Sequence, residues 1–192
     1  MKYYSFRNDE LHITKELDRY KSDNSLVFQH DITKGLPDEY NDCDILYSEP
    51  SWLKGYEVFK NRANVDVGSY QSYLERLSDL TKDNIPIVLV IGKMALKKMS
   101  QNYTEIPVKM NGYWETAYGW NLDLSKYKIN KLNNYDLISL LANKFDRVGD
   151  MCCGYGNTGR IFKEKGKTFV MSDISKKVVY YVANKIMQYE DI

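Results

Sequence analysis

Apolar and polar residues recur along this chain with two periods, and each period predicts a different kind of element. In YQSYLERLSDLTK (70–82), the apolar side chains are three or four positions apart, which places them on one face of a helix. The following segment, IPIVLVIG (85–92), is an unbroken apolar run, which is typical of a strand buried on both faces in a parallel sheet. A helix is therefore expected to lead directly into a central strand.

The same patterns alternate along most of the chain. Asn111-Gly112 lies between two alternating segments within 105–120, which predicts an antiparallel hairpin. Other strands are expected at 25–32, 43–48 and 168–173 and just before Gly154, and other helices at 10–21, 134–145 and 160–166, with a short helix after 92. Strands that alternate with helices indicate an α/β fold, here a mostly parallel sheet with one antiparallel hairpin and helices on both faces.

Composition limits the class of protein. A chain of 192 residues, of which 43% are hydrophobic, can bury one sizeable core, so residues 1–192 are expected to form a single domain. No N-terminal segment resembles a signal peptide, and no apolar run approaches the roughly 18 residues of a membrane span. These features predict a soluble, cytoplasmic protein with no membrane partner.

Charge and cysteine content narrow the chemistry further. The net charge of +1 indicates no strong overall attraction to nucleic acid, although 92–101 and 126–131 are locally basic. The three cysteines, of which Cys152 and Cys153 are adjacent, make a poor disulfide framework, and no Cys/His spacing suggests zinc. We therefore expect reduced thiols that line a core or a cofactor, and no metal site.

The most informative motif is GYGNTG (154–159), which satisfies GxGxxG between a short strand and a helical segment. Glycines there permit a tight turn and let the backbone approach a ligand, while the helix N-terminus favours polar or negative groups. The next strand, TFVMSD (168–173), ends on Asp173, which is placed to hold a ribose diol. This order predicts a nucleoside-containing cofactor; the alternative is an ordinary glycine-rich turn with a surface acid.

The position of this motif in the chain argues against a dinucleotide. A dinucleotide-binding domain continues through several strands after its first βαβ unit, but the chain of 192 residues ends soon after Asp173. The other strands are therefore expected to come from earlier sequence, so the strand ending at Glu49 can lie beside the strand ending at Asp150. The tetrapeptide EPSW (49–52) would then face the cofactor.

Three segments of the sequence, 26–32, 49–52 and 150–159, resemble those of a known family. DMCCGYGNTG (150–159) resembles the D-P-F-C-G-S-G-T-T-G cofactor motif of S-adenosylmethionine-dependent amino-methyltransferases, with the family's next acid at Asp173. EPSW (49–52) resembles their catalytic D-P-P-Y/W motif, and LVFQHDI (26–32) resembles their strand that ends in an acid, here Asp31. The resemblance implies a Rossmann-like methyltransferase fold and S-adenosylmethionine as cofactor.

The order of the motifs is similar to that of the permuted class of DNA amino-methyltransferases, in which the catalytic motif precedes the cofactor motif. KINKLNNYDLISLL (128–141) is similar to the Lys-Pro segment and helix before the cofactor motif of that class, with Leu132 in place of the proline. The implied cofactor-binding residues are Asp31, Asp150, Cys152, Gly154, Gly156, Asn157, Thr158, Asp173 and Ile174. The implied catalytic residues are Glu49, Pro50, Ser51 and Trp52.

The residue types of EPSW suit methyl transfer to an exocyclic amine. The lone pair of such an amine is delocalised into the base, so attack on a methyl sulfonium requires acceptors that draw the nitrogen toward a tetrahedral geometry. We assign Glu49 as one acceptor, the backbone of Ser48 to Pro50 as the second, and Trp52 as the platform on which a flipped base stacks. Glu49 and Ser51 depart from the family's shorter acid and second proline. The alternative is a strand-ending turn with a surface acid and a core tryptophan.

These features together predict methylation of a nucleobase amino group, with adenine in DNA ahead of cytosine. An RNA or small-molecule methyltransferase and a catalytically silent cofactor-binding protein are the alternatives. Most of the sequence between the two motifs is needed to complete the sheet, so no separate target-recognition domain is expected. Substrate contacts are expected from 53–69, the hairpin at Asn111-Gly112 and the basic segments, or from a second subunit of a homodimer.

Overall fold

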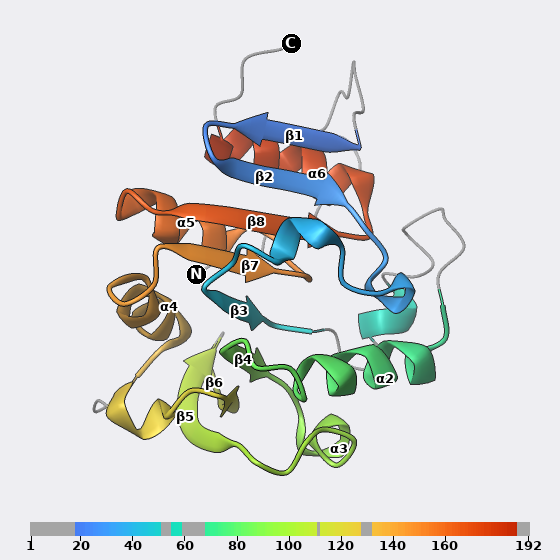
Figure 1. Ribbon diagram of the computed structural model, residues 1–192, viewed down its shortest axis with the longest axis vertical. Helices are drawn as coiled ribbons and strands as arrows, with labels where there is room; N and C mark the ends of the chain where they lie inside the picture. The colour runs from blue at the N-terminus through green and yellow to red at the C-terminus, as the bar shows by residue number, and fades with distance from the viewer. Residues whose placement is uncertain (1–17, 51–54, 59–67, 111, 128–131, 188–192) are drawn as a thin grey trace.

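The computed structural model describes residues 18–50, 55–58, 68–110, 112–127 and 132–187, which form one eight-stranded sheet flanked by helices (Figure 1). The strands are β1 (Arg19–Ser22), β2 (Ser25–Gln29), β3 (Ile45–Ser48), β4 (Ile87–Val90), β5 (Thr104–Met110), β6 (Tyr113–Trp120), β7 (Arg147–Asp150) and β8 (Thr168–Asp173). The α-helices are α2 (Tyr70–Leu80), α3 (Lys93–Leu96), α4 (Asn134–Ala142), α5 (Asn157–Glu164) and α6 (Lys176–Val182). Shorter turns are the 3-10 helices η1 (Ile32–Lys34), η2 (Asp38–Tyr40) and η3 (Leu124–Tyr127) and the π-helix η4 (Ala183–Met187).

The strand order is β1-β2-β8-β7-β3-β4-β6-β5, so strands distant in sequence become neighbours in space. The strands from β2 to β4 in this order run parallel, whereas β1 and the β5–β6 hairpin are antiparallel additions at the two edges. Parallel pairing places the carboxyl ends of β2, β8, β7 and β3 at one edge of the sheet. The predicted adjacency of the strands that end near Glu49 and Asp150 is confirmed by the pairing of β3 with β7.

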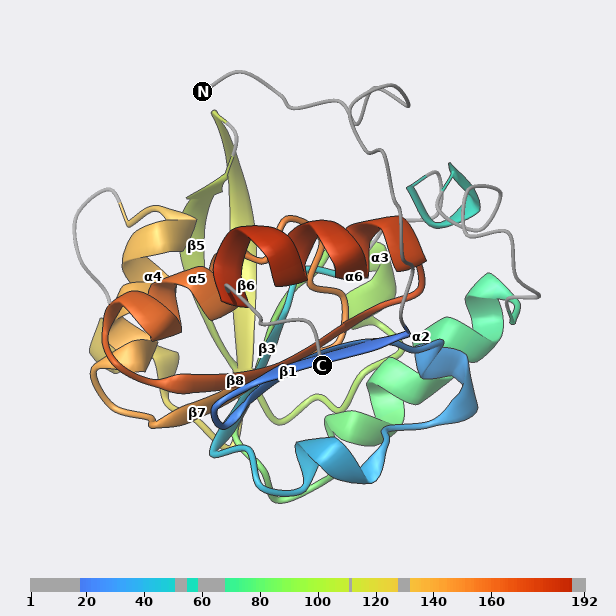
Figure 2. The ribbon, with the colours of Figure 1, turned by 90° about the horizontal axis from the view of Figure 1, so that it is seen from above.

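Alternating side chains divide the interior into two hydrophobic cores, one on each face of the sheet. On β3, Ile45 and Tyr47 belong to the core that contains α4, α5 and α6, whereas Leu46 belongs to the core that contains α2. All three side chains are fully buried. Figure 2 shows α5 and α6 on one face of the sheet and α2 on the other. A strand covered on both faces is mostly apolar, as Ile45 to Tyr47 of β3 are, and its last residue, Ser48, is buried with its hydroxyl bonded to Asp150.

Most predicted elements are present, and the predicted α/β class is confirmed. Helix α2 occupies most of 70–82 and buries its apolar face, and β4 lies within 85–92 with every residue buried. Strands β5 and β6 form the predicted hairpin, although Asn111 of its turn lies outside the described residues. Within the part of the chain that is described, no helix has the length and apolar character needed to span a membrane.

The helix predicted at 10–21 is wrong at its C-terminal end. Arg19–Ser22 is strand β1, which pairs with β2 through a tight turn at Asp23, a non-glycine residue with a φ of +50°. Tyr20 is buried in this strand. The hydrogen bonds that β1 makes with the edge of β2 outweigh the local preference for a helix. Residues 10–17 lie outside the described residues.

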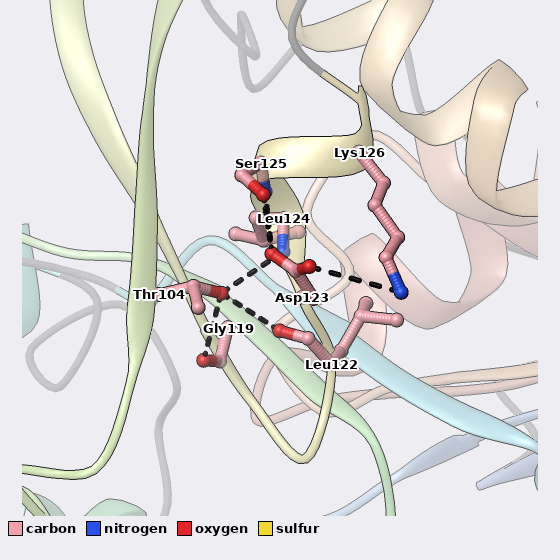
Figure 3. Close-up of polar contacts among 7 residues, drawn as sticks. All are labelled: Thr104, Gly119, Leu122, Asp123, Leu124, Ser125 and Lys126. Carbon is pink, nitrogen blue, oxygen red and sulfur yellow. Dashed lines mark hydrogen bonds and ion pairs between the residues drawn. The ribbon is translucent and has the colours of Figure 1, made fainter.

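A group of hydrogen bonds at Thr104 fixes the turn that leads from β6 to η3 (Figure 3). The Thr104 hydroxyl donates to the Leu122 carbonyl over 2.7 Å and accepts the N–H of Leu124 over 2.9 Å. Asp123 accepts hydrogen bonds from the N–H and the hydroxyl of Ser125. The chain that leaves this turn continues to α4, whose first residue reaches the end of β3.

Candidate active site

A cavity of about 240 Å³ lies at the carboxyl edge of the sheet, where β2, β8, β7 and β3 end. Its lining brings together predicted residues from four separate segments: Asp31, Glu49, Asp150, Cys152, Gly154, Asn157, Thr158, Asp173 and Ile174. Open α/β sheets bind ligands at this edge, where the strand order reverses direction. The cavity is therefore the candidate active site.

The glycine turn after β7 forms one wall of the cavity. Gly154 has a φ of +48° and Gly156 a φ of +73°, both in the left-handed region that favours glycine. A Cβ atom at Gly154 would meet no atom within 4 Å, whereas one at Gly156 would lie 2.4 Å from Ile186 Cδ1. Gly154 therefore leaves open space for a ligand, and Gly156, the N-cap residue of α5, shapes the turn through close packing.

Asp173 ends β8 and is held by backbone groups. Its Oδ2 accepts the N–H of Gly154 over 3.2 Å, and its Oδ1 accepts the N–H of Ser175 over 2.9 Å. Burial raises the pKa of Asp173 to about 6, and the backbone hydrogen bonds oppose this rise. A carboxylate held in this way at the end of the second strand of a βαβ unit can accept hydrogen bonds from two adjacent hydroxyls.

Asp31 follows β2, which pairs parallel with β8, so Asp31 lines the cavity near the end of β8. Its Oδ1 caps η1 by accepting the N–H of Thr33 over 2.9 Å. Its Oδ2 is buried and has no hydrogen-bond partner among the described residues. A buried oxygen without a partner carries a desolvation cost, so a ligand that donates a hydrogen bond there would relieve it.

Asp150 links the strands that meet at the floor of the cavity. Its Oδ1 accepts the Ser48 hydroxyl of β3 over 2.9 Å and the N–H of Cys152 over 3.2 Å. Burial raises the pKa of Asp150 to about 7; hydrogen bonds from Thr158 and Ser48 oppose the rise, and the nearby charge of Glu49 adds to it. Two carboxyl groups therefore lie close together here, and the charge of Glu49 favours the neutral form of Asp150.

Glu49 follows β3 directly and is half-buried in the cavity lining. Its Oε1 accepts the Nδ2–H of Asn134, the first residue of α4, and lies 3.3 Å from the Tyr47 hydroxyl. Burial raises the pKa of Glu49, and the hydrogen bonds from Asn134 and Tyr47 oppose the rise. An ionised Glu49 can accept hydrogen bonds from a substrate at this end of the cavity.

Two predicted parts of the site, EPSW and the loop 53–69, are covered only in part. The described residues leave out Ser51, Trp52, 53–54 and 59–67. Within EPSW, Glu49 lines the cavity, whereas Pro50 is buried beside it and does not line it. Within the predicted substrate loop 53–69, residues 55–58 are helical. The roles assigned to Ser51 and Trp52 stay predictions.

Sequence reasoning missed two tyrosines that line the cavity. The ring centroids of Tyr56 and Tyr73 lie 4.9 Å apart. The Tyr56 hydroxyl donates to the Gly68 carbonyl over 2.6 Å, and the Tyr73 hydroxyl lies 3.5 Å from Cys152 Sγ. The helical period of 70–82 is compatible with an inward Tyr73, but the contact of Tyr73 with Cys152 joins segments far apart in sequence and leaves no local signal.

The two adjacent cysteines do not have the properties of nucleophiles. Burial raises the pKa of Cys152 to about 12 and that of Cys153 well above its ordinary value. Both thiols therefore stay protonated and act as lining or packing groups. Among the residues that the structure describes, no cluster of His, Cys, Asp and Glu side chains suits a metal ion.

No protein-family model matches the chain, and a search of curated proteins finds no significant match. Among solved structures, a putative DNA modification methylase from Thermus thermophilus matches with a TM-score of 0.51 at 12% identity, over 84% of this chain and 94% of that one. The same methylase complexed with S-adenosyl-L-methionine matches at 12% identity with a TM-score of 0.50, over 84% and 93%. The fold is that of a Rossmann-like methyltransferase.

Two further solved structures match with lower TM-scores. M1.HpyAVI in its SAM complex has a TM-score of 0.48 at 14% identity, over 83% of this chain and 98% of that one. The cytosine-N4-specific PvuII DNA methyltransferase has a TM-score of 0.43 at 12% identity, over 89% and 95%. At such identities the likeness concerns the fold, so the chemistry of this chain has to be argued from its own residues.

Proposed function

We propose that this protein is an S-adenosylmethionine-dependent methyltransferase that acts on an exocyclic amino group of a nucleobase, with adenine in DNA as the first candidate substrate. The observation that carries this proposal is the cavity, where Asp31, Asp173 and the glycine turn lie on one side and Glu49 on the other. The first side suits a nucleoside cofactor, and the second suits an amine.

The cofactor side fits S-adenosylmethionine in three respects. Asp173 would accept the ribose hydroxyls, and the unpaired Oδ2 of Asp31 would accept a hydrogen from the adenine amino group. The open space at Gly154 would let the backbone approach the ligand. When bound, this cofactor supplies a methyl group on a sulfonium. A methylase of the same fold has been solved with it, which supports the choice of cofactor.

The acceptor side would prepare the amine for methylation. Glu49 uses Oε1 for its contacts with Asn134 and Tyr47, so Oε2 would accept a hydrogen from the substrate amine. Backbone carbonyls from Ser48 to Pro50 would accept the second hydrogen, and Trp52 would stack on the base. Acceptors on both hydrogens turn the nitrogen lone pair out of conjugation with the ring, which makes the nitrogen a better nucleophile. The extra proton on the methylated nitrogen is then lost readily.

The β5–β6 hairpin is the best described candidate for contact with DNA. Because β6 is antiparallel to both β4 and β5, the hairpin tip lies at the same edge of the sheet as the cavity. Tyr113 and Trp114 are exposed near this tip, and Lys109 bridges to Asn133 at the start of α4. Exposed aromatic side chains stack on bases. We propose a permuted, single-domain enzyme over 1–192 in which this hairpin or a second subunit replaces a separate recognition domain.

The test is incubation with methyl-labelled S-adenosylmethionine and a panel of duplex DNA, single-stranded DNA, RNA and free nucleosides. We expect label in DNA, with N6-methyladenine as the product in the nucleoside digest, and no label with Glu49→Gln. N4-methylcytosine would correct the base, and label in RNA or nucleosides alone would correct the substrate. Cofactor binding without transfer to any member of the panel would favour a silent binding protein.

A further inference from the structure

Two polar side chains, those of Tyr47 and Asn134, meet on one side of the candidate acceptor Glu49. Tyr47 and Glu49 are two positions apart on an extended chain, so they point to the same face of the sheet, which α4 covers. Asn134 reaches the same place from a segment 85 residues further along the chain. Its Nδ2 donates to Glu49 Oε1, and its Oδ1 accepts the Tyr47 hydroxyl. One amide thus joins both residues.

This contact is an interior one. Asn134 is 7% exposed and Tyr47 is fully buried, so their polar atoms cannot rely on water and need partners inside the protein. A tyrosine hydroxyl has one proton and can serve only one acceptor at a time. With that proton donated to Asn134 Oδ1, the Asn134 amide is the donor committed to Glu49.

Asn134 is not needed to begin α4. The preceding residue, Asn133, is the N-cap: its side chain accepts the N–H of Asp136 over 2.9 Å, and Asp136 in turn accepts the N–H of Asn133 over 3.4 Å. This reciprocal pair is a capping box, which satisfies the first turn of the helix without any side chain at position 134. The Asn134 amide is therefore available for a role outside the helix.

We propose that Asn134 is a positioning residue that holds Glu49 Oε1, so that Oε2 faces the reacting amine. This inference rests on the proposed function, because it assigns Asn134 a part in the same reaction. Glu49 has a longer and more flexible side chain than aspartate, and a fixed donor at Oε1 restricts its rotamers. The neighbouring residue Tyr135 lies 3.4 Å from Asn157 of the cavity lining, so the first turn of α4 contacts both sides of the site.

The electrostatic role follows from the groups that face Glu49. Within the described parts of the chain, these titratable groups are Asp150 from β7 and the Tyr47 phenol from β3, while α4 presents the neutral Asn134. Burial disfavours an ionised Glu49. The Asn134 donor favours the ionised form, which is the form that accepts a hydrogen from an amine. Removal of this donor should therefore move the titration of Glu49 to higher pH.

The experiment compares Asn134→Ala with Asn133→Ala, a matched control that removes the same side chain one position earlier and weakens the helix cap instead. The Glu49 carboxyl is followed by carbon-13 NMR in protein labelled at the glutamate side chains, with Glu49→Gln to identify its resonance. We expect the Glu49 titration midpoint to rise by about one to two pH units in Asn134→Ala, as for a lost hydrogen bond to a charged group. Asn133→Ala should leave the midpoint near the wild-type value.

A second readout is the pH dependence of methyl transfer. In Asn134→Ala, the acidic limb of the kcat profile should move to higher pH by the same amount, with KM for DNA and cofactor affinity close to wild type. Tyr47→Phe keeps the ring in the core and should shift the acidic limb in the same direction by a smaller amount. It is the substitute variant if Asn134→Ala folds poorly. Equal Glu49 midpoints in Asn134→Ala and Asn133→Ala would overturn the inference. Failure of the proposed function is a separate result: wild-type protein that neither binds the cofactor nor transfers a methyl group.

Discussion

The two sides of the cavity are held in different ways. On the cofactor side, Asp173 is held by backbone N–H groups of Gly154 and Ser175, close to its own βαβ unit. On the acceptor side, Glu49 is held by the side chain of Asn134, which lies 85 residues away in sequence. A backbone donor survives most substitutions, whereas one substitution removes a side-chain donor. The cofactor side should therefore be robust and the acceptor side sensitive.

The largest effect is expected at the acceptor. Glu49→Ala removes the group that would hold the amine hydrogen, so kcat should fall by about 10²- to 10³-fold, as when one preorganised hydrogen-bonding group is lost from an active site. Cofactor affinity should stay within about tenfold of wild type, because the residues assigned to the cofactor are Asp31, Asp173 and the glycine turn and not Glu49. Methyl transfer assays and calorimetry on the same preparation check both values. A fall in cofactor affinity as large as the fall in kcat would contradict the assignment of separate cofactor and acceptor sides.

The next effect concerns Asp150, at the floor between the two sides. Its pKa of about 7 in the folded protein lies above the ordinary value of 3.8, so the folded state binds this proton more tightly than the unfolded state. The resulting stabilisation is present below about pH 4 and is lost as the pH rises toward about 7. Asp150→Asn removes this dependence.

Chemical denaturation of both proteins between pH 4 and 8 measures this change. The free energy of unfolding of Asp150→Asn, relative to wild type, should rise by about 2 to 4 kcal/mol over that range. The matched variant Asp173→Asn should give a smaller rise that is complete near pH 6, because the pKa of Asp173 is raised only to about 6. A difference that does not change with pH would contradict the assigned burial of Asp150.

Two glycines with similar backbone conformations provide a test of the cofactor side of the cavity. Gly154 and Gly166 both have positive φ, +48° and +69°, and a Cβ atom at either would meet no atom within 4 Å. Alanine should therefore destabilise both by a similar amount, about 1 to 2 kcal/mol. Only Gly154 lines the cavity, so only Gly154→Ala should also weaken cofactor binding, by about 1 to 3 kcal/mol of steric cost. Equal cofactor affinities in the two variants would show that the space at Gly154 is not used.

The smallest effect is expected on the hairpin. Trp114 is 57% exposed near the tip, so Trp114→Ala should raise KM for DNA by an amount that corresponds to about 1 kcal/mol, the low end for a base–aromatic stack. Trp114→Phe keeps a ring and should retain most of the affinity. Steady-state kinetics on the best DNA substrate measure this, and an unchanged KM in Trp114→Ala would remove the hairpin from the substrate surface.

Sequence reasoning predicted the cofactor side better than the acceptor side for a physical reason. The turn at Gly154 and the acid at Asp173 belong to one short segment, in which local backbone conformation determines the geometry. The pairing of β3 with β7 was also predicted, from the alternation of strands and helices and the place of the glycine motif, and it is confirmed. Asp31 was placed through the resemblance alone, and its unpaired Oδ2 was visible only in three dimensions.

The features that the sequence did not predict depend on contacts between distant segments. In the sequence, nothing distinguishes Asn134 from other residues in the first turn of a helix. Its contact with Glu49 depends on the packing of α4 against the end of β3. The place of Tyr56 beside Tyr73 depends on tertiary packing, and β1 forms a strand only because the edge of β2 is next to it. Such contacts have no local pattern, so side chains around Glu49 had to be located in the structure.

The most direct test of the account is calorimetry with S-adenosylmethionine on wild type, Asp173→Asn and Glu49→Gln. Wild type should bind, Asp173→Asn should bind more weakly by about 1 to 3 kcal/mol, as for a hydrogen bond to a charged group, and Glu49→Gln should bind nearly as wild type does. Tighter binding of NAD than of S-adenosylmethionine, or no heat with wild type, would contradict the assigned cofactor. Equal losses in the two variants would contradict a cavity with separate cofactor and acceptor sides.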